Sequence, residues 1–235
     1  MKINIHQKRL ISSVLPGRYL RYLYALNKAS AIQIDALKLI YVPIPKVANR
    51  SIKEILAERI RLKYTVSAHK AKWKYIPLAS VAKSSSYSFS FVRNPLDRLV
   101  SCYVQKTQMK DPIHNFWKYG NLVYPNMSFT AFVSMVCKTP DYLADRHFKS
   151  QHQFLIINGD LSVDYLGKYE SLKEDWKFLS EKFELPTLVH ANPSVRTGIE
   201  NYYTKELAQK AQKRYIQDIE TFGYTQEVNS FINSL

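Results

Sequence analysis

Two segments of this chain each run from an apolar stretch through a short basic loop into a pattern typical of a helix. In the first segment, the apolar stretch is residues 37–43, the loop is residues 44–50, and the helix is expected from Ser51. In the second, the apolar stretch is residues 87–92, the loop is Arg93 with Asn94, and the helix is expected from Pro95. The start of a helix presents backbone N–H groups and a partial positive charge to an anion. Two such junctions therefore predict a ligand with two separated phosphate groups.

The charge of the chain is concentrated in its first half. The net charge is +15, and residues 46–110 hold 14 Lys and Arg against 3 Asp and Glu, whereas residues 160–235 hold 9 against 12. This imbalance favours an anionic partner, which charge alone leaves open among nucleotide, polyanionic glycan, nucleic acid and membrane surface. A hydrophobic content of 46% over 235 residues indicates a globular chain, which we interpret as one domain, residues 1–235.

The cysteines and the amino-terminal residues exclude several other classes of protein. Cys102 and Cys137 have no metal-ligand spacing, so no metal is expected, and Cys102 is expected to be buried. Charged residues and a proline interrupt residues 1–25, which leaves no apolar run long enough for a signal peptide or a membrane span. We therefore expect no transmembrane segment and a cytoplasmic location.

Apolar periodicity predicts an alternation of strands and helices. Strands are expected at 37–43, 87–92 and 163–169, and helices from Ser51, from Pro95, at 128–137, at 171–183 and at 204–222, with capping boxes at Ser51 and Ser171. This alternation predicts an α/β fold whose central, mainly parallel sheet is flanked by helices. In the basic stretch 63–86, Lys70, Lys72 and Lys74 alternate, which fits either a glycan groove or a solvated edge strand.

The first loop has the position of a P-loop but a different sequence. It lacks the G-x-x-x-x-G-K-[ST] pattern, and no aspartate ends a neighbouring strand to hold Mg²⁺, which disfavours ATP hydrolysis. A site without metal would neutralise phosphate with Lys46, Arg50, the Ser51 hydroxyl and the helix start. The alternative is a surface lysine beside an ordinary N-cap serine.

The second loop offers an arginine at the end of a strand. Arg93 can present two N–H groups to a phosphate, and Ser101 follows two turns into the helix, whose start Asn94 and Pro95 define. The alternative makes Arg93 a salt-bridge partner and Ser101 a tolerated helical serine. Neither loop excludes its structural interpretation when taken alone.

A series of ordered motifs extends the pattern beyond the two loops. They are R-N-P-x-x-R-L-V-S-x-Y at 93–103, Asp145-x-His147-x-x-x-Gln151, residues 163–172, His190-x-Asn192-x-Ser194-x-Arg196, Tyr202-Tyr203-Thr204, and Tyr215-x-x-Asp218-x-x-x-Phe222-Gly223-Tyr224. The chain thereby resembles the PAPS-dependent sulfotransferases, and within them the type 2 carbohydrate sulfotransferases that include the HNK-1 and chondroitin enzymes. The resemblance implies the P-loop-like sulfotransferase fold. Arg50 departs from the family, which has a small or hydroxylated residue there, and the absence of a cysteine-rich patch and membrane stem suggests a compact bacterial member.

The resemblance implies a donor and a set of roles. The donor would be PAPS (3′-phosphoadenosine 5′-phosphosulfate), with Lys46 at the oxygen between its sulfate and 5′-phosphate. The 5′-phosphate would be held by Ser51 and the amides of Ala48, Asn49, Arg50 and Ser51, and the 3′-phosphate by Arg93, Ser101 and Arg196. The acceptor would be a hydroxyl on a glycan or another small molecule.

A histidine is the natural candidate for the general base. We identify His147, in the family-like D-x-H motif, with His69 and His152 as weaker candidates. The alternative is that His147 only binds substrate or satisfies a buried hydrogen bond. Asp145 either orients the imidazole or pairs with Arg146.

Two other functions remain open at this point. The main alternative is a non-catalytic binder of polyanions, nucleic acid included, which uses the basic first half. No known nucleic-acid-binding motif is found, so nucleic acid is not the expected partner. The second alternative function is that of a nucleotide kinase, which the absence of a Walker loop disfavours. The transferase hypothesis requires Lys46 and Arg93 to converge on one ligand.

Overall fold

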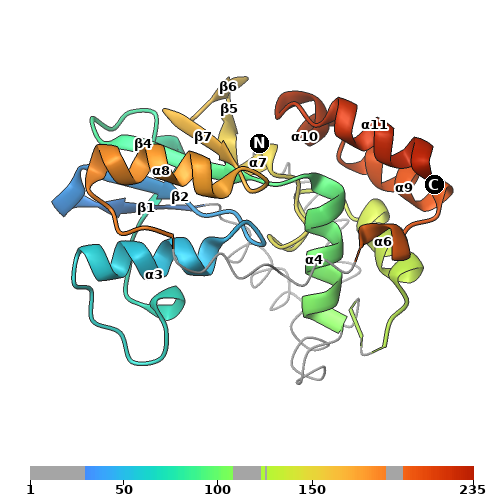
Figure 1. Ribbon diagram of the computed structural model, residues 1–235, viewed down its shortest axis with the longest axis horizontal. Coiled ribbons are helices and arrows are strands. Elements are labelled where there is room, and N and C mark those ends of the chain that lie inside the picture. Colours follow the sequence, from blue (N-terminus) through green and yellow to red (C-terminus); the bar gives the residue numbers. More distant parts are fainter. Residues whose placement is uncertain (1–29, 108–122, 125, 189–197) are drawn as a thin grey trace, which may run out of the picture.

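The computed structural model describes residues 30–107, 123–124, 126–188 and 198–235, which form a mixed α/β fold (Figure 1). In this part of the chain a five-stranded sheet has the order β3-β1-β2-β4-β7, and β5 and β6 form a separate hairpin. The strands are β1 Ser30–Ile34, β2 Leu39–Val42, β3 Lys74–Pro77, β4 Tyr87–Val92, β5 Ile156–Ile157, β6 Asp160–Leu161 and β7 Tyr165–Lys168. Residues 1–29, whose first part was expected to lack a membrane span, lie outside the described residues.

The strand directions confirm the expected α/β class with a mainly parallel sheet. β2 pairs in parallel with β4, and β4 pairs in parallel with β7. β1 is antiparallel to both of its neighbours, β2 and β3, so it alone in this sheet runs against the other strands. The three strands predicted from sequence are therefore the parallel part of the sheet, from β2 through β4 to the edge strand β7, and β4 has the predicted bounds.

Two strands at one side of the sheet were not predicted. β1 falls within residues 1–36, a polar and aromatic-rich stretch for which the sequence predicted no strand. It joins β2 through a tight turn in which Lys38 adopts a left-handed conformation, with φ 46°. β3 is an edge strand with mostly exposed side chains, so it shows no hydrophobic alternation. Of the two interpretations of the alternating lysines, the edge strand is correct for Lys74, which pairs with Asp35 at 2.6 Å.

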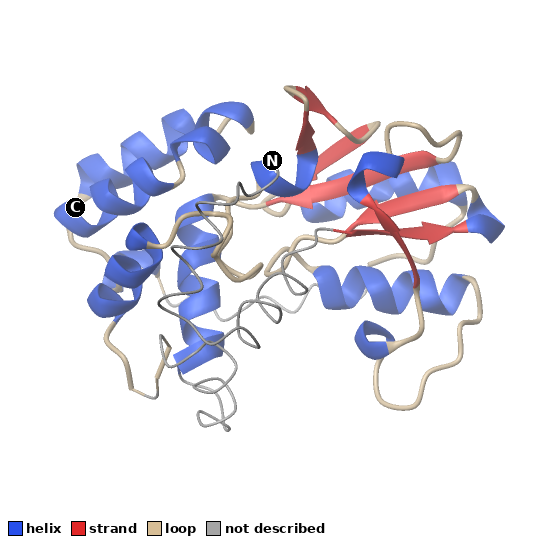
Figure 2. Ribbon diagram, turned by 180° about the vertical axis from the view of Figure 1, so that it is seen from behind, coloured by secondary structure: helices blue, strands red, loops and turns tan. Residues whose placement is uncertain are grey.

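The helices fall into two groups (Figure 1). α3 and α8 run alongside the sheet, whereas α4, α6, α9, α10 and α11 gather at the other end of the molecule, beyond the ends of the parallel strands. Figure 2, from behind, shows the strands in front of α8. The helix bounds are α3 Asn49–Arg59, α4 Pro95–Thr107, α6 Phe129–Lys138, α7 His152–Leu155, α8 Leu172–Phe183, α9 Lys205–Arg214, α10 Ile216–Thr221 and α11 Thr225–Ser234.

Apolar side chains join these layers. Trp176 of α8 packs its ring against Phe89 and Phe91 of β4, at centroid distances of 6.3 and 6.4 Å. The aromatic residues of the Tyr202-Tyr203 and Tyr215/Phe222 motifs were predicted to pack in the core. Tyr203, Tyr215 and Phe222 are buried, as is Cys102, whereas Tyr202 is partly buried. Burial of this kind is the main stabilising contribution to the fold, and it leaves the polar loops at the strand ends as the place for chemistry.

Several helix boundaries differ from the prediction. α3 begins at Asn49, two residues before Ser51, so Ser51 is not its cap. Ser171 precedes α8, but its hydroxyl donates to Asp175 at 2.8 Å instead of capping an amide. The single helix predicted over 204–222 divides at Tyr215 into α9 and α10, because the Tyr215 hydroxyl is anchored on the Phe148 carbonyl at 2.6 Å.

In the described residues, no helix combines the length and the apolar character that crossing a bilayer would require.

Candidate active site

The two predicted loops meet at one edge of the sheet. β2 and β4 are adjacent and parallel, so the loops that follow them leave from the same side. Arg93, directly after β4, donates from Nη1 to the backbone carbonyl of Lys46 in the loop after β2, at 3.4 Å. The two residues on which the transferase hypothesis depends are therefore in direct contact, although they lie 47 positions apart in the sequence.

The loop after β2 has the backbone shape of an anion-binding turn. Lys46 and Ala48 both have positive φ, 71° and 45°, with Val47 between them. The first bond of the α-helical ladder in α3 joins the Ile52 N–H to the Ala48 carbonyl at 3.0 Å. The amides of residues 49–51 precede that ladder and lie at the positive end of the helix, so they suit a phosphate. Arg50 is exposed at this start.

Lys46 lies among cations instead of carboxylates. Its pKa is lowered to about 8, mainly by burial and in addition by the nearby charges of Arg93, Lys106 and Arg98. Its ammonium group donates to Gln105 Oε1 at 3.3 Å, and no carboxylate of the described residues forms an ion pair with it. A partly buried lysine without a counter-ion is ready to bind an anion that the protein does not itself supply.

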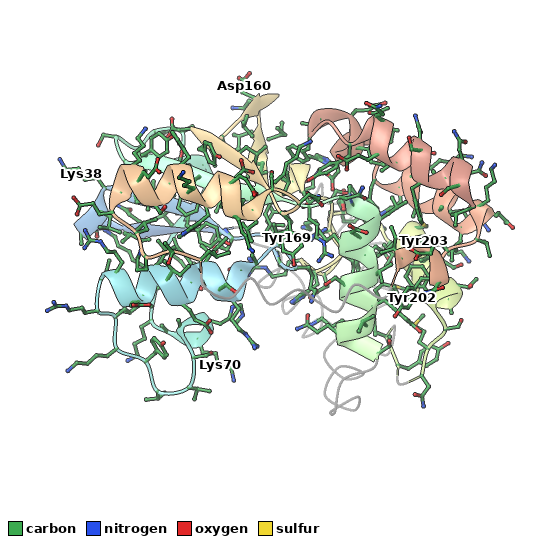
Figure 3. All side chains as sticks on the ribbon, in the orientation of Figure 1. Lys38, Lys70, Asp160, Tyr169, Tyr202 and Tyr203 are labelled. Atoms are coloured by element: carbon green, nitrogen blue, oxygen red, sulfur yellow. The ribbon has the colours of Figure 1, made fainter. Side chains whose placement is uncertain are left out.

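Arg93 is held firmly and keeps an unused donor. The residue is 7% exposed, its guanidinium lies 4.4 Å from the centre of the Tyr169 ring, and its buried Nε has no hydrogen-bond partner among the residues that the structure describes. Figure 3 labels Tyr169 at the centre of the molecule, between α8 and α4. No carboxylate in the described ranges pairs with Arg93. Within these ranges, Arg93 is therefore not the salt-bridge residue of the alternative interpretation.

The start of α4 follows the prediction. Asn94 caps it by accepting the Leu96 N–H on Oδ1 at 3.0 Å, and Pro95 is the first helical residue. Ser101 lies two turns along α4 and is partly exposed. Arg196 and His190 lie outside the described residues. The expected contact of Arg196 with a 3′-phosphate therefore stays a prediction.

Arg98 is a residue of the site that sequence analysis assigned no role. It is 2% exposed and donates to three backbone carbonyls, those of Pro45 (3.0 Å), Lys149 (2.8 Å) and Arg146 (3.1 Å). It therefore ties the loop after β2 to the segment that carries His147. The available signal was its place in the R-N-P-x-x-R motif, on the same face of α4 as buried Cys102.

His147 is oriented by Asp145. Asp145 Oδ1 accepts both the His147 backbone N–H at 2.9 Å and a bond with the imidazole Nδ1 at 2.6 Å. Burial disfavours the charged form of Asp145, but the bonds from His147 outweigh this effect, and its pKa lies below the ordinary value. Of the two interpretations, Asp145 therefore orients the imidazole. With Nδ1 held by the carboxylate, Nε2 is the nitrogen suited to take a proton.

The two weaker histidine candidates have other surroundings. The Nδ1 atom of His152 lies 3.0 Å from Asp218 Oδ1, which indicates a structural role for His152. His69 lies in a short helical turn, Ala68–Lys70, before the edge strand β3. Asp218 holds His152 as Asp145 holds His147, through the backbone N–H and Nδ1, but the Nε2 atom of His152 already lies 2.8 Å from the Gln153 amide nitrogen, so His147 remains the candidate base.

Two further cations near these loops were missed, the buried Lys53 and the partly buried Arg146. Lys53, 3% exposed, donates to the Tyr75 hydroxyl at 3.2 Å, and burial together with the charge of Arg146 lowers its pKa to about 8. Arg146 has a buried Nε without a partner. The sequence carries no signal for either, because Lys53 occupies an ordinary position in α3 and is covered only in the folded chain.

The comparisons with known proteins agree with this geometry. The model of the sulfotransferase family matches residues 30–225, which is most of the chain, so the chain belongs to the sulfotransferase family. No curated protein and no solved structure matches it. The described residues contain no group of three His, Cys, Asp or Glu side chains arranged to hold a metal ion.

Proposed function

We propose that this protein moves the sulfuryl group of PAPS to a hydroxyl of a carbohydrate acceptor, within one domain. Family membership supports sulfuryl transfer in general. The observation that supports PAPS is the contact between Arg93 and Lys46, because it brings two anion-binding loops together at one edge of the sheet. A donor with phosphate groups at both ends matches such a pair.

The donor would be bound through charge and backbone amides. The amides of Ala48, Asn49, Arg50 and Ser51, with the Ser51 hydroxyl, would hold the 5′-phosphate at the start of α3. Arg93 and Ser101 would hold the 3′-phosphate, with the unused Nε of Arg93 as one donor. The excess of buried cations over carboxylates in this region supports a multiply charged ligand.

Transfer would be an in-line displacement at sulfur. The acceptor oxygen forms a bond to sulfur while the bond between sulfur and the bridging oxygen breaks, and that oxygen leaves with the electron pair as part of adenosine 3′,5′-bisphosphate (PAP). Lys46 would stabilise the charge that grows on the bridging oxygen. His147 Nε2 would take the proton of the acceptor hydroxyl, and Asp145 would stabilise the imidazolium that results.

The alternative of a non-catalytic polyanion binder fits these residues less well. A protein that binds DNA or heparin through charge presents exposed Lys and Arg side chains to the backbone of the polymer. Arg93 and Arg98 are instead 7% and 2% exposed, and both are engaged with backbone groups of the loops. Their arrangement favours a small anion that enters between the loops.

The test is binding of PAP, followed by the effect of Lys46→Ala on transfer. We expect the wild-type chain to bind PAP in calorimetry. We expect Lys46→Ala to reduce transfer from PAPS to desulfated chondroitin by roughly 10²–10³-fold without loss of the fold, since it removes one stabilising group of the transition state. The control is Lys74→Ala, an exposed lysine whose partner is Asp35, which should leave transfer unchanged.

Two results would contradict the proposal. One is the absence of PAP binding by the folded wild-type chain. The other is salt-dependent binding of heparin that persists in the double variant Lys46→Ala, Arg93→Ala, together with no transfer by the wild type, which is the result expected of a polyanion binder.

A further inference from the structure

Asp218 is a fully buried carboxylate that the transfer mechanism does not use. It lies in α10, is 0% exposed, and accepts the backbone N–H of Gln151 at 2.7 Å and that of His152 at 2.8 Å. Its Oδ1 also lies 3.0 Å from the imidazole Nδ1 of His152. Asp218 therefore caps the start of α7 from a position 66 residues later in the chain. A charged acceptor for buried amides is a strong constraint on their position.

Gln151 passes this constraint to Arg93. The Gln151 side chain, itself 0% exposed, accepts the Arg93 N–H on Oε1 at 3.0 Å and donates from Nε2 to the Arg93 carbonyl at 2.8 Å. Both peptide groups that flank the Cα of Arg93 are thus held by one side chain. This fixes the direction in which the arginine side chain leaves the end of β4.

We propose that Asp218 is a positioning residue for the 3′-phosphate of the nucleotide, acting through Gln151 on Arg93. The inference rests on the proposed function, which makes Arg93 the ligand of that phosphate. An arginine binds phosphate well only when its guanidinium is held close to the productive geometry. Tyr169 holds the guanidinium itself, at 4.4 Å from the ring centre, and the Asp218–Gln151 pair holds the backbone from which it extends.

Asp141 provides a matched control in the same segment. Its Oδ1 accepts the N–H of Ser150, the residue just before Gln151, at 3.0 Å, and pairs with Arg214 at 2.6 Å. The partly buried Asp141 and the fully buried Asp218 therefore hold consecutive backbone amides. Only Asp218 holds the residue whose side chain is bonded to Arg93.

The experiment compares affinities for PAP and for AMP, which lacks the 3′-phosphate. We expect Asp218→Asn to weaken PAP binding roughly tenfold and AMP binding less than twofold, which is about the effect of losing a charge-assisted hydrogen bond on the positioned ligand. Asp141→Asn should lower the melting temperature but keep the ratio of the two affinities. A loss of stability alone would weaken the binding of PAP and of AMP by the same factor, so it would leave the ratio of the two affinities unchanged.

A second variant tests the route through Gln151. Gln151→Leu removes both bonds to Arg93 but keeps the backbone amide that Asp218 accepts, so it should also lower the affinity ratio. In the double variant Asp218→Asn, Gln151→Leu the ratio should equal that of Gln151→Leu alone, because residues acting through one contact are not additive.

Two results would overturn the inference. The first is an unchanged ratio of PAP to AMP affinity in Asp218→Asn, which includes an equal loss of both affinities, while the wild type binds PAP. The second is an additive loss in the double variant. A wild-type chain that binds neither nucleotide would instead overturn the proposed function, and this inference with it.

Discussion

The two loops of the site reach their shapes in different ways. The loop after β2 contains two non-glycine residues in the left-handed region, Lys46 and Ala48, and no side chain of its own caps α3. The loop after β4 is capped by its own Asn94, which in turn receives support from Glu170, whose Oε1 accepts the Asn94 N–H at 2.8 Å. The helix after the first loop therefore has no side-chain cap from its own loop, whereas the helix after the second loop does.

The support for the first loop comes from the second. Arg98 of α4 holds the Pro45 carbonyl at 3.0 Å, and Arg93 holds the Lys46 carbonyl at 3.4 Å. The two loops of the candidate site are thus one connected unit, in which the second loop supports the first. A change in the second loop should accordingly damage both.

The largest expected effect comes from Arg98→Met, which keeps the length of the side chain and removes the charge. It would leave three backbone carbonyls without their donor, and buried hydrogen bonds to a charged group contribute about 1.5–3 kcal/mol each. We expect a loss of about 3 kcal/mol or more in the free energy of unfolding, measured by urea denaturation. The control is Arg61→Met, an arginine exposed at the surface. A loss below about 1 kcal/mol would mean that the first loop holds its own shape.

The next effect concerns the charge of Lys46. Its pKa of about 8 means that the lysine loses its charge as the pH rises above that value, so PAP affinity should fall, by roughly tenfold per pH unit. For the ligand-free protein, the free energy of unfolding should instead rise with pH between 8 and 10.5. In this range the unfolded chain binds more protons than the folded chain does.

The variant Lys46→Arg separates the two trends. An arginine keeps its charge throughout this range, so the fall in PAP affinity should disappear in calorimetry at pH 7 to 9.5. The rise in stability should persist in part, since burial also lowers the pKa of Lys53 to about 8. An unchanged affinity profile in Lys46→Arg would assign the titration to another group.

The smallest effect sharpens the comparison of the two helix starts. Asn94→Ala removes the cap of α4 and should cost about 1 kcal/mol in the free energy of unfolding. Ala48→Gly relieves a left-handed alanine, but glycine also loses more backbone entropy on folding, and these terms of about 1 kcal/mol offset each other. Thermal denaturation of both variants should show a loss only for Asn94→Ala. A comparable loss for Ala48→Gly would indicate a packing role for the Ala48 methyl group.

The strands and helices with strong local sequence patterns were predicted correctly, and those with weak patterns were not. The strands at the centre of the sheet were recovered because a strand buried on both faces forms a continuous apolar run, as in β4. β3 remained one of two interpretations because its side chains are mostly exposed at the edge, and β1 was missed because Ser30 and Gln33 interrupt its apolar run. The helix predicted over 204–222 was interrupted by the tertiary anchor of Tyr215, which no local pattern records.

The sequence by itself determined which residues stand at the ends of the parallel strands, and therefore that Lys46 and Arg93 would lie at one edge of the sheet. It did so because strand periodicity and the Asn94-Pro95 cap are local properties of the chain, and adjacent parallel strands end at the same edge of a sheet. Only the tertiary structure decided how those residues are held. Arg98 acts across 53 positions and Asp218 across 67, and the energy of such contacts depends on burial that only the folded chain creates.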